Sequence, residues 1–239
     1  MKKKQLTGFI DKYHLAGNAN SVRLDVKDKK LSCNFITDDQ NVVGSVSMDN
    51  FDIDDVTLGV YATSQLTKLL TALDEDVEFR VNNADGTAFS INLSDKTTDV
   101  TFMLADLSVI RQVPAMKQLP DFNVKISLTK DFADKFVKSK NALPETENFA
   151  IESDALGTNM ILNYSTLNTN RITWPTTPEG EASDLKATCF SANLFKEILV
   201  ANKDAESGFI EVSEAGLARV TFTGKDYSST YYLVQLQAA

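Results

Sequence analysis

The side chains that most often perform covalent or metal chemistry are scarce in this chain of 239 residues. There is one histidine, His14, and there are two cysteines, Cys33 and Cys189. A zinc site typically takes three or four His, Cys or carboxylate ligands with one close pair, and no such spacing occurs. A histidine-assisted nucleophile would have to use His14, which has no nucleophile near it in the sequence. The two cysteines are interpreted as reduced core residues.

Motifs for nucleotide binding and nucleophilic catalysis are also missing. The sequence contains no G-x-x-x-x-G-K-[ST], G-x-G-x-x-G, G-x-S-x-G or H-E-x-x-H. Carboxylates are abundant, and the cluster Asp52, Asp54 and Asp55 leaves a Mg²⁺-dependent hydrolase open as an alternative that activity assays can test. The simpler interpretation of this cluster is a solvent-exposed segment that precedes a strand. We therefore predict that the protein is not an enzyme and has no catalytic residues, metal site or cofactor.

Four helices are predicted from apolar residues spaced i, i+3, i+4 and i+7. Leu6, Phe9, Ile10 and Tyr13 form the first such stripe. The four windows are 2–13, 64–73, 130–143 and 192–203. Hydroxyl side chains at the starts of the last three windows are predicted N-caps, namely Ser64, Thr129 and Ser191.

Each predicted helix is followed by two runs of alternating apolar and polar residues around a turn, which is typical of a β-hairpin. The four turns are expected at 27–30, 82–86, 154–157 and 214–216. Further strands are expected just before the last three helices, at 56–62, 123–129 and 185–191. Two such repeats precede a segment without periodicity that contains Pro114 and Pro120, and two follow it. We predict two similar domains, 1–104 and 122–239, joined by a connector over 105–121.

Positive charge is concentrated in the predicted helices. The chain has 24 basic and 33 acidic residues and a net charge of −9, which by itself argues against a protein that coats nucleic acid. The four helix windows contain 11 basic and four acidic residues, a balance of +7, whereas the remainder carries −16. A helical wheel places most of these lysines away from the apolar stripes, with Lys140 nearer the apolar side. The pattern favours one helical surface that contacts the phosphates of a polyanion rather than its bases. Solubilising lysines on ordinary exposed helix faces are the alternative.

Three segments resemble the sliding clamps of T-even-like bacteriophages, which are DNA polymerase processivity factors. The clearest is FDIDDVTLGVYATSQLTKLLTALDEDVEF over 51–79. KKKQLTGFIDKY resembles the opening helix of that family, and TYYLVQLQA resembles its closing strand. The likeness in order and pattern covers nearly the whole chain.

This resemblance implies an α+β DNA-clamp fold in which each domain packs two helices on antiparallel β-sheets. It further implies a homotrimer that closes into a ring around duplex DNA without reading its sequence. The ring would be loaded by an ATP-dependent clamp loader and would tether the replicative DNA polymerase during DNA replication. By the same resemblance, the side chains facing the DNA are Lys4, Lys12, Lys68, Lys135, Lys138, Lys196 and Lys203. The open strand edges of duplicated domains favour pairing between subunits.

Apolar side chains beside the connector are the predicted partner-binding site. They are Val109, Ile110, Val113, Met116 and Leu119, with Tyr232 and Val234 from the closing strand. The alternative is that these residues hold the connector against its own domains. Trp174 is interpreted as a packed loop anchor rather than as part of a site.

The location predicted for the protein is the cytoplasm of an infected bacterial host. The N-terminus lacks the apolar run of a signal peptide, and no stretch approaches the length of a membrane span, so neither secretion nor membrane association is expected. A structural phage protein of duplicated α+β domains without a DNA role is the alternative function. A dependence of polymerase stimulation on the loader and ATP would separate the two.

Overall fold

The computed structural model describes residues 1–114, 118–167 and 169–236 and divides into two compact units. The first unit contains Met1–Pro114 together with Asp226–Ser229. The second contains the described residues of 118–225 and of 230–236. The border between the units falls inside the connector that the sequence predicts over 105–121.

The first unit contains two α-helices, two short 3₁₀ helices and seven strands. The helical segments are α1 (Lys3–His14), η1 (Leu15–Gly17), α2 (Thr63–Leu70) and η2 (Leu107–Val109). The strands are β1 (Val22–Lys27), β2 (Lys30–Ile36), β3 (Val42–Met48), β4 (Val56–Val60), β5 (Glu78–Ala84), β6 (Thr87–Ser94) and β7 (Asp99–Met103). They form two antiparallel arrangements, one in the order β4-β1-β2-β3 and one in the order β5-β6-β7.

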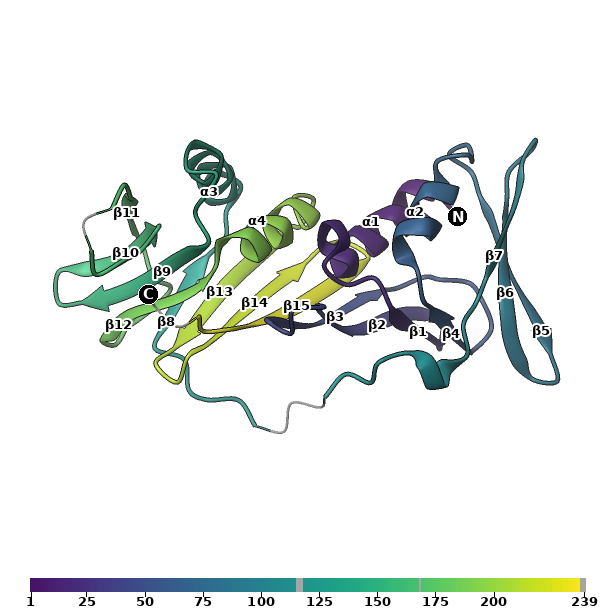
Figure 1. Ribbon diagram of the computed structural model, residues 1–239, viewed down its shortest axis with the longest axis horizontal. Helices are drawn as coiled ribbons and strands as arrows, with labels where there is room; N and C mark the ends of the chain where they lie inside the picture. The colour runs from purple at the N-terminus through teal and green to yellow at the C-terminus, as the bar shows by residue number, and fades with distance from the viewer. Residues whose placement is uncertain (115–117, 168, 237–239) are drawn as a thin grey trace. The chain divides into compact units, whose positions relative to one another are not determined.

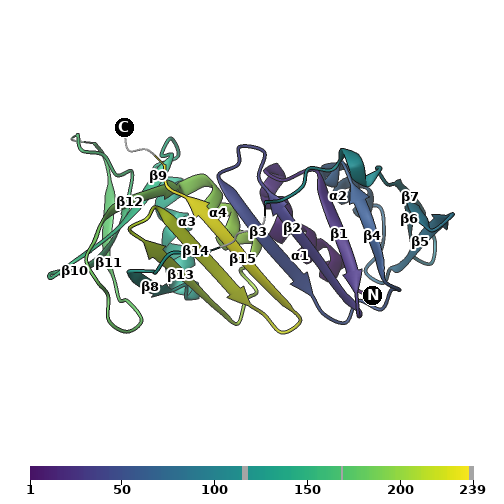
Figure 2. The same ribbon diagram turned by 90° about the horizontal axis from the view of Figure 1, so that it is seen from below.

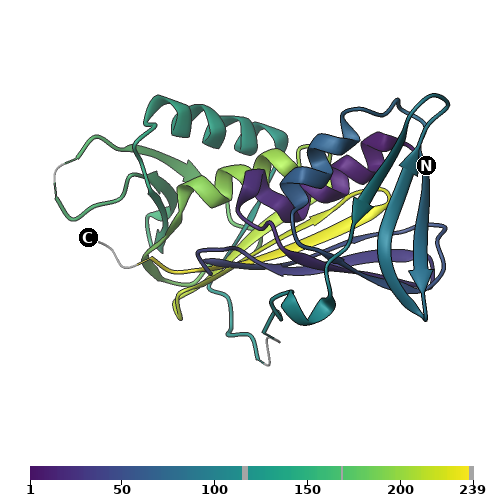
Figure 3. The ribbon, with the colours of Figure 1, turned by 45° about the vertical axis from the view of Figure 1, so that its right-hand side comes forward.

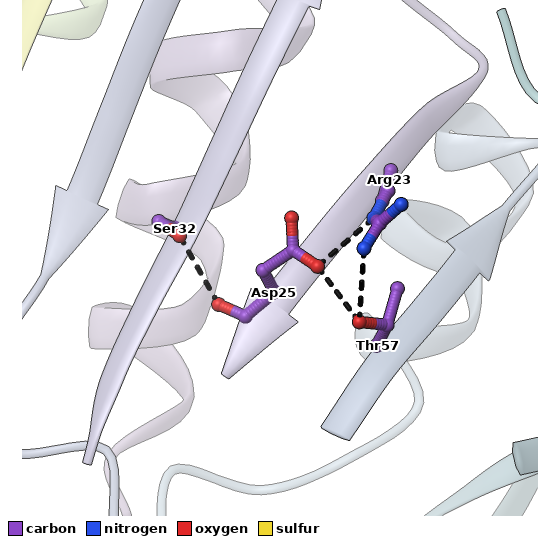
Figure 4. Close-up of polar contacts among 4 residues, drawn as sticks. All are labelled: Arg23, Asp25, Ser32 and Thr57. Carbon is purple, nitrogen blue, oxygen red and sulfur yellow. Dashed lines mark hydrogen bonds and ion pairs between the residues drawn. The ribbon is translucent and has the colours of Figure 1, made fainter. Parts of the chain in front are cut away.

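The two faces of the β1–β4 strands differ in polarity because alternate side chains point to opposite sides. Val22, Leu24 and Val26 are buried, and α1 and α2 cover one face of these strands (Figures 1 and 2). On β1 the intervening residues Arg23 and Asp25 form a polar cluster with Thr57 on β4 (Figure 4). Asp25 Oδ1 accepts from Arg23 Nε at 2.9 Å and from the Thr57 hydroxyl at 2.8 Å.

The second unit has a similar set of elements. Its helices are α3 (Lys130–Ala142) and α4 (Ala192–Ala201). Its strands are β8 (Val124–Ser127), β9 (Asn148–Asp154), β10 (Gly157–Leu162), β11 (Ile172–Thr176), β12 (Leu185–Ser191), β13 (Ser207–Ser213) and β14 (Leu217–Thr223). The last strand, β15 (Tyr227–Val234), begins in the first unit and continues in the second.

In the second unit the strands also form two groups, in the orders β15-β14-β13-β8 and β11-β10-β9-β12. The helix α4 lies over one face of β13 and β14 (Figures 1 and 3). A cluster of aromatic rings joins the helices to the strands, with Phe136 at 4.8 Å from Phe195 and 5.4 Å from Phe149 between ring centroids. Since all three side chains are fully buried, this cluster forms the centre of the core of the unit.

All four predicted helices and all four predicted hairpins are present. Thr129 and Ser191 are confirmed as N-caps, since their hydroxyls accept from the backbone N–H groups of Phe132 and Leu194. The cap predicted at Ser64 is wrong because α2 begins at Thr63 after Ala62.

Several other details differ from the sequence prediction. The helix α4 ends at Ala201, so Lys203 lies in the turn beyond it rather than on its polar face. Trp174 is packed, as expected, but it belongs to strand β11 and not to a loop. Strands β3, β7 and β11 have no counterpart in the sequence prediction. Strand β11 contains Pro175, and proline usually argues against a strand, but it is tolerated here because β11 is an edge strand.

Candidate functional site

The first lysines of the chain anchor helix α1 within the first unit. Lys2 forms an ion pair with Asp76 at 2.5 Å, and the Lys3 ammonium donates to the carbonyl of Leu73. The pKa of Lys2 is raised above its ordinary value, mainly by the hydrogen bond to the Asp76 carboxylate and secondly by the negative charge of that carboxylate. Both cations therefore bind groups of the same unit, and these contacts attach the start of α1 to the segment around residues 73–76.

Two predicted DNA-facing lysines of the first unit are exposed. Lys4 lies in the first turn of α1 and Lys68 in the last turn of α2. A lysine in the last turn is also favoured by the negative end of the helix dipole. Both side chains are therefore accessible to a phosphate.

Lys12 is a correction to the predicted set. The wheel places it away from the apolar stripe, yet its side chain is only 2% exposed. Its Nζ lies 3.9 Å from the centroid of the Tyr227 ring, which belongs to the segment Asp226–Ser229 of the same unit. A contact between residues 215 positions apart has no signature in helical periodicity, so the wheel could not show that this face of α1 is covered. Lys12 is therefore excluded from the set of lysines available to DNA.

In the second unit, the predicted lysines differ in their surroundings. Lys135 and Lys138 are exposed on α3, and Lys203 is exposed after α4. Lys196 on α4 is half-buried, and its Nζ lies 3.9 Å from a carboxylate oxygen of Glu197. Lys135 Nζ lies 5.3 Å from the centroid of the Trp174 ring. Three of the four side chains are thus exposed, with Lys135 beside an aromatic ring, and the charge of Lys196 is partly compensated.

Lys140 is buried, as its position on the wheel suggests, and its Nζ donates to the carbonyl of Pro144 at 2.7 Å. Burial lowers the pKa of Lys140, and the positive charge of Lys196 lowers it further. Lys140 on α3 and Lys196 on α4 are therefore near enough for the charge of Lys196 to act on Lys140.

His14 belongs to a polar contact between α1 and α2. Its Nε2 lies 3.1 Å from the Ser64 hydroxyl, which donates to Asn20 Oδ1 at 2.9 Å. Because that hydroxyl proton is used by Asn20, the Ser64 oxygen is left to accept from Nε2–H of a neutral His14. Burial lowers the pKa of His14 below its ordinary value, in agreement with a neutral ring.

The residues predicted to bind a partner are not equally accessible. Val109 is 59% exposed and Val234 is 49% exposed, whereas Ile110 is buried. The remaining described members, Val113, Leu119 and Tyr232, are half-buried, and Met116 lies outside the described residues. Ile110 therefore fits the alternative interpretation, in which the connector is held against its own domain.

An apolar hollow of about 500 Å³ in the first unit includes Val109 and residues that no sequence motif indicates. Tyr61 is 62% exposed and Met103 is 65% exposed. The hollow is lined by Tyr61, Ala62, Gln65, Phe102, Met103, Leu104, Ala105 and Val109. Gly59 allows the wall to form, since Ala105 donates its N–H to the Gly59 carbonyl at 2.8 Å and a Cβ on Gly59 would lie 2.4 Å from the Ala105 oxygen. The sequence signal that could have indicated Met103 is the alternation of buried and exposed residues along β7, which places this long apolar side chain on the exposed face.

Within the described ranges, no three His, Cys, Asp or Glu side chains are grouped in a way that could hold a metal ion. Cys33 and Cys189 are both buried and unbonded to each other. None of the helices in the described part of the chain has the length and apolar character needed to cross a membrane.

No protein-family model matches the sequence, and the search of curated proteins also gave no match. Solved structures do match over nearly the whole chain. One match is A. fulgidus PCNA, bound to the C-terminal region of FEN-1. Its TM-score is 0.79 at 15% identity, and the match covers 100% of this chain and 98% of that one.

Two further matches also cover nearly the whole chain, at similarly low identity. Proliferating Cellular Nuclear Antigen from Entamoeba histolytica has a TM-score of 0.71 at 16% identity, over 98% of this chain and 94% of that one. A PCNA2–PCNA3 complex from Sulfolobus tokodaii has a TM-score of 0.73 at 11% identity, over 98% and 97%. The chain therefore has the fold of PCNA-type sliding clamps, and the predicted α+β DNA-clamp fold is confirmed.

Proposed function

We propose that the protein is a sliding clamp that encircles duplex DNA and tethers a replicative DNA polymerase, in the manner of the T-even-like phage clamps that its sequence resembles. The proposal is carried by one observation: in an acidic chain with a clamp fold, the helices of both units expose lysines. The set now comprises Lys4, Lys68, Lys135, Lys138 and Lys196 on the helices and Lys203 in the turn after α4.

The chemistry of these side chains suits a ring that holds DNA and still slides. Lysine is a point charge on a flexible stem, so it can pass from one phosphate to the next without the bidentate locking typical of arginine. Each phosphate contact adds to the salt dependence of binding without reading sequence. The acidic remainder of the chain disfavours contact with DNA elsewhere.

The proposed assembly is a homotrimer of about three times 26.3 kDa. The strands β5, β7, β11 and β12 stand at the ends of the two smaller sheets, and such strands can pair with another copy. An ATP-dependent loader would open and close the ring, and no catalytic group of this chain would take part in that step. The limits 1–104, 105–121 and 122–239 remain our proposal for its domains.

The apolar hollow beside Val109 is the proposed site for the tethering segment of a partner. An exposed tyrosine and an exposed methionine around a concave apolar surface suit a peptide with one large apolar anchor. Val113, Leu119, Tyr232 and Val234 remain further candidates.

The test of the DNA-facing role is charge reversal on α3 and α4. We expect Lys138→Glu with Lys196→Glu to weaken loading onto closed circular DNA and polymerase stimulation about tenfold or more, and to leave the trimer intact. Lys27→Glu with Lys225→Glu is the matched control, since both side chains are exposed outside the helices and outside the strands proposed to pair between subunits.

Normal loading by the helix variant, or equal losses in the control, would remove these helices from a DNA-facing role. The wild-type ring should also leave circular DNA once the DNA is linearised. Equal retention on circular and linear DNA with free ends would contradict topological linkage. A chain that stays monomeric and never stimulates a polymerase with loader and ATP would favour a structural protein.

A further inference from the structure

Trp174, which is the single tryptophan of the chain, lies directly beside one of the exposed lysines. It pairs with Met160 across β10 and β11 and is 5% exposed. Its ring meets that of Phe136 on α3 at 6.4 Å between centroids with an interplanar angle of 70°. The indole is thus held between a strand and a helix and has little freedom to move.

Lys135 precedes Phe136 in α3, and its Nζ lies 5.3 Å from the centre of this fixed ring. That separation is within the range of a cation–π interaction. Lys138 is the natural comparison, because it is exposed on the same helix and, in the part of the chain that the structure describes, lies over no aromatic ring. A free lysine stem samples many rotamers, and confining it on phosphate binding has an entropic cost.

We infer that Trp174 is a positioning residue for phosphate binding, in that it holds the Lys135 ammonium at the surface of α3 before DNA arrives. This inference rests on the proposed function, because it takes a DNA phosphate as the anion that Lys135 meets. Lys135 pays less of the entropic cost than Lys138, since its side chain is already restricted. A phosphate that binds the ammonium where it lies over the ring also changes the electrostatic surroundings of the only tryptophan, so Trp174 emission reports on this contact.

The first measurement uses the full chain and a short DNA duplex at low ionic strength, with affinities compared in a double-mutant cycle. Trp174→Leu should weaken duplex binding about twofold, and Trp174→Phe should largely restore it because a ring is retained. The loss should vanish in a Lys135→Ala background and persist in a Lys138→Ala background. A loss of the same size in the Lys135→Ala background would assign Trp174 a structural role alone and overturn the inference.

The second measurement leaves Trp174 unchanged, so it stays informative even if variants of that residue fold poorly. Adding the duplex should change the tryptophan emission of the wild-type chain and of Lys138→Met, but not that of Lys135→Met. An equal change in Lys135→Met would overturn the inference while leaving the clamp proposal intact. A wild-type chain that binds no duplex and is never retained on circular DNA would overturn both.

Discussion

The two units use the same kinds of elements but join their helices by different chemistry. Between α1 and α2 there are two polar contacts: the Tyr13 hydroxyl lies 3.4 Å from Thr63 Oγ1, and His14 contacts Ser64. Between α3 and α4 the contact is aromatic, with Phe136 and Phe195 meeting edge to face. Equivalent pairs of helices can therefore be fixed either by directed hydrogen bonds or by ring packing.

This difference has consequences for stability. Hydrogen bonds contribute modestly when made, and they depend on protonation state where a histidine takes part. Buried rings contribute through area and packing, which do not change with pH. The helix starts also differ, but in the opposite sense, since hydroxyl side chains cap α3 and α4, whereas neither α1 nor α2 has such a cap. We expect the first unit to be the more sensitive to pH and the second to be the more sensitive to loss of volume.

The largest effect is expected from Phe136→Ala in the aromatic cluster. This side chain is fully buried against three other rings, those of Phe149, Trp174 and Phe195. The free energy of unfolding should fall by about 3–5 kcal/mol, from lost burial and the cavity left behind. Urea denaturation of the wild type and the variant measures this loss.

Two control variants show whether the comparison of the units holds. Phe132→Ala removes a half-buried ring from the same helix and should cost less than Phe136→Ala. Tyr13→Phe removes only the polar part of the contact in the first unit and should cost about 1 kcal/mol. If Tyr13→Phe destabilises as much as Phe136→Ala, the distinction between a polar and an aromatic contact is wrong.

An intermediate effect is expected from the surface hollows, which also differ between the units. The hollow in the first unit exposes Tyr61 and Met103, whereas one in the second is lined partly by Asn163, Thr169 and Asn170. Met103→Asp should weaken binding of the cognate polymerase about tenfold, because it places a charge where an apolar anchor is expected. Co-elution of clamp and polymerase measures this change.

Asn170→Asp serves as the control for Met103→Asp, since it adds a negative charge at the other hollow and should leave polymerase binding unchanged. Unaltered binding by Met103→Asp would contradict the proposed docking site. Dissociation of the trimer by the same variant would instead assign the hollow to the contact between subunits.

The smallest effect is expected from His14, and it concerns pH. The pKa of His14 in the folded chain is lowered by burial, so below the ordinary value of 6.5 the unfolded chain binds the proton more readily. Stability should therefore fall as the pH drops from 6.5 towards the folded pKa, and it should not depend on this group above 6.5. Denaturation at about pH 7.5 and about pH 5.5 should show a smaller loss for His14→Gln than for the wild type. An equal loss in both proteins would mean that His14 does not contribute.

The sequence by itself determined the elements that repeat locally. Periodicity located the four helices and four hairpins, because the residues that bury a helix stripe or a strand face are near one another in the chain. Two of three N-caps followed from a hydroxyl next to an apolar stripe. The N-cap prediction for Ser64 is wrong for a physical reason. Its hydroxyl and its backbone N–H both donate to the side chain of Asn20, which is distant in the sequence.

Only the tertiary structure decided which side chains are available at the surface. Lys12 and Lys138 look alike on a helical wheel, but Tyr227 returns from the end of the chain to cover one of them. Tyr61 and Met103 lie 42 positions apart and meet at one hollow only because β4 and β7 end beside each other. Local patterns record how a segment buries its own apolar face, whereas exposure depends on which remote segment packs against it.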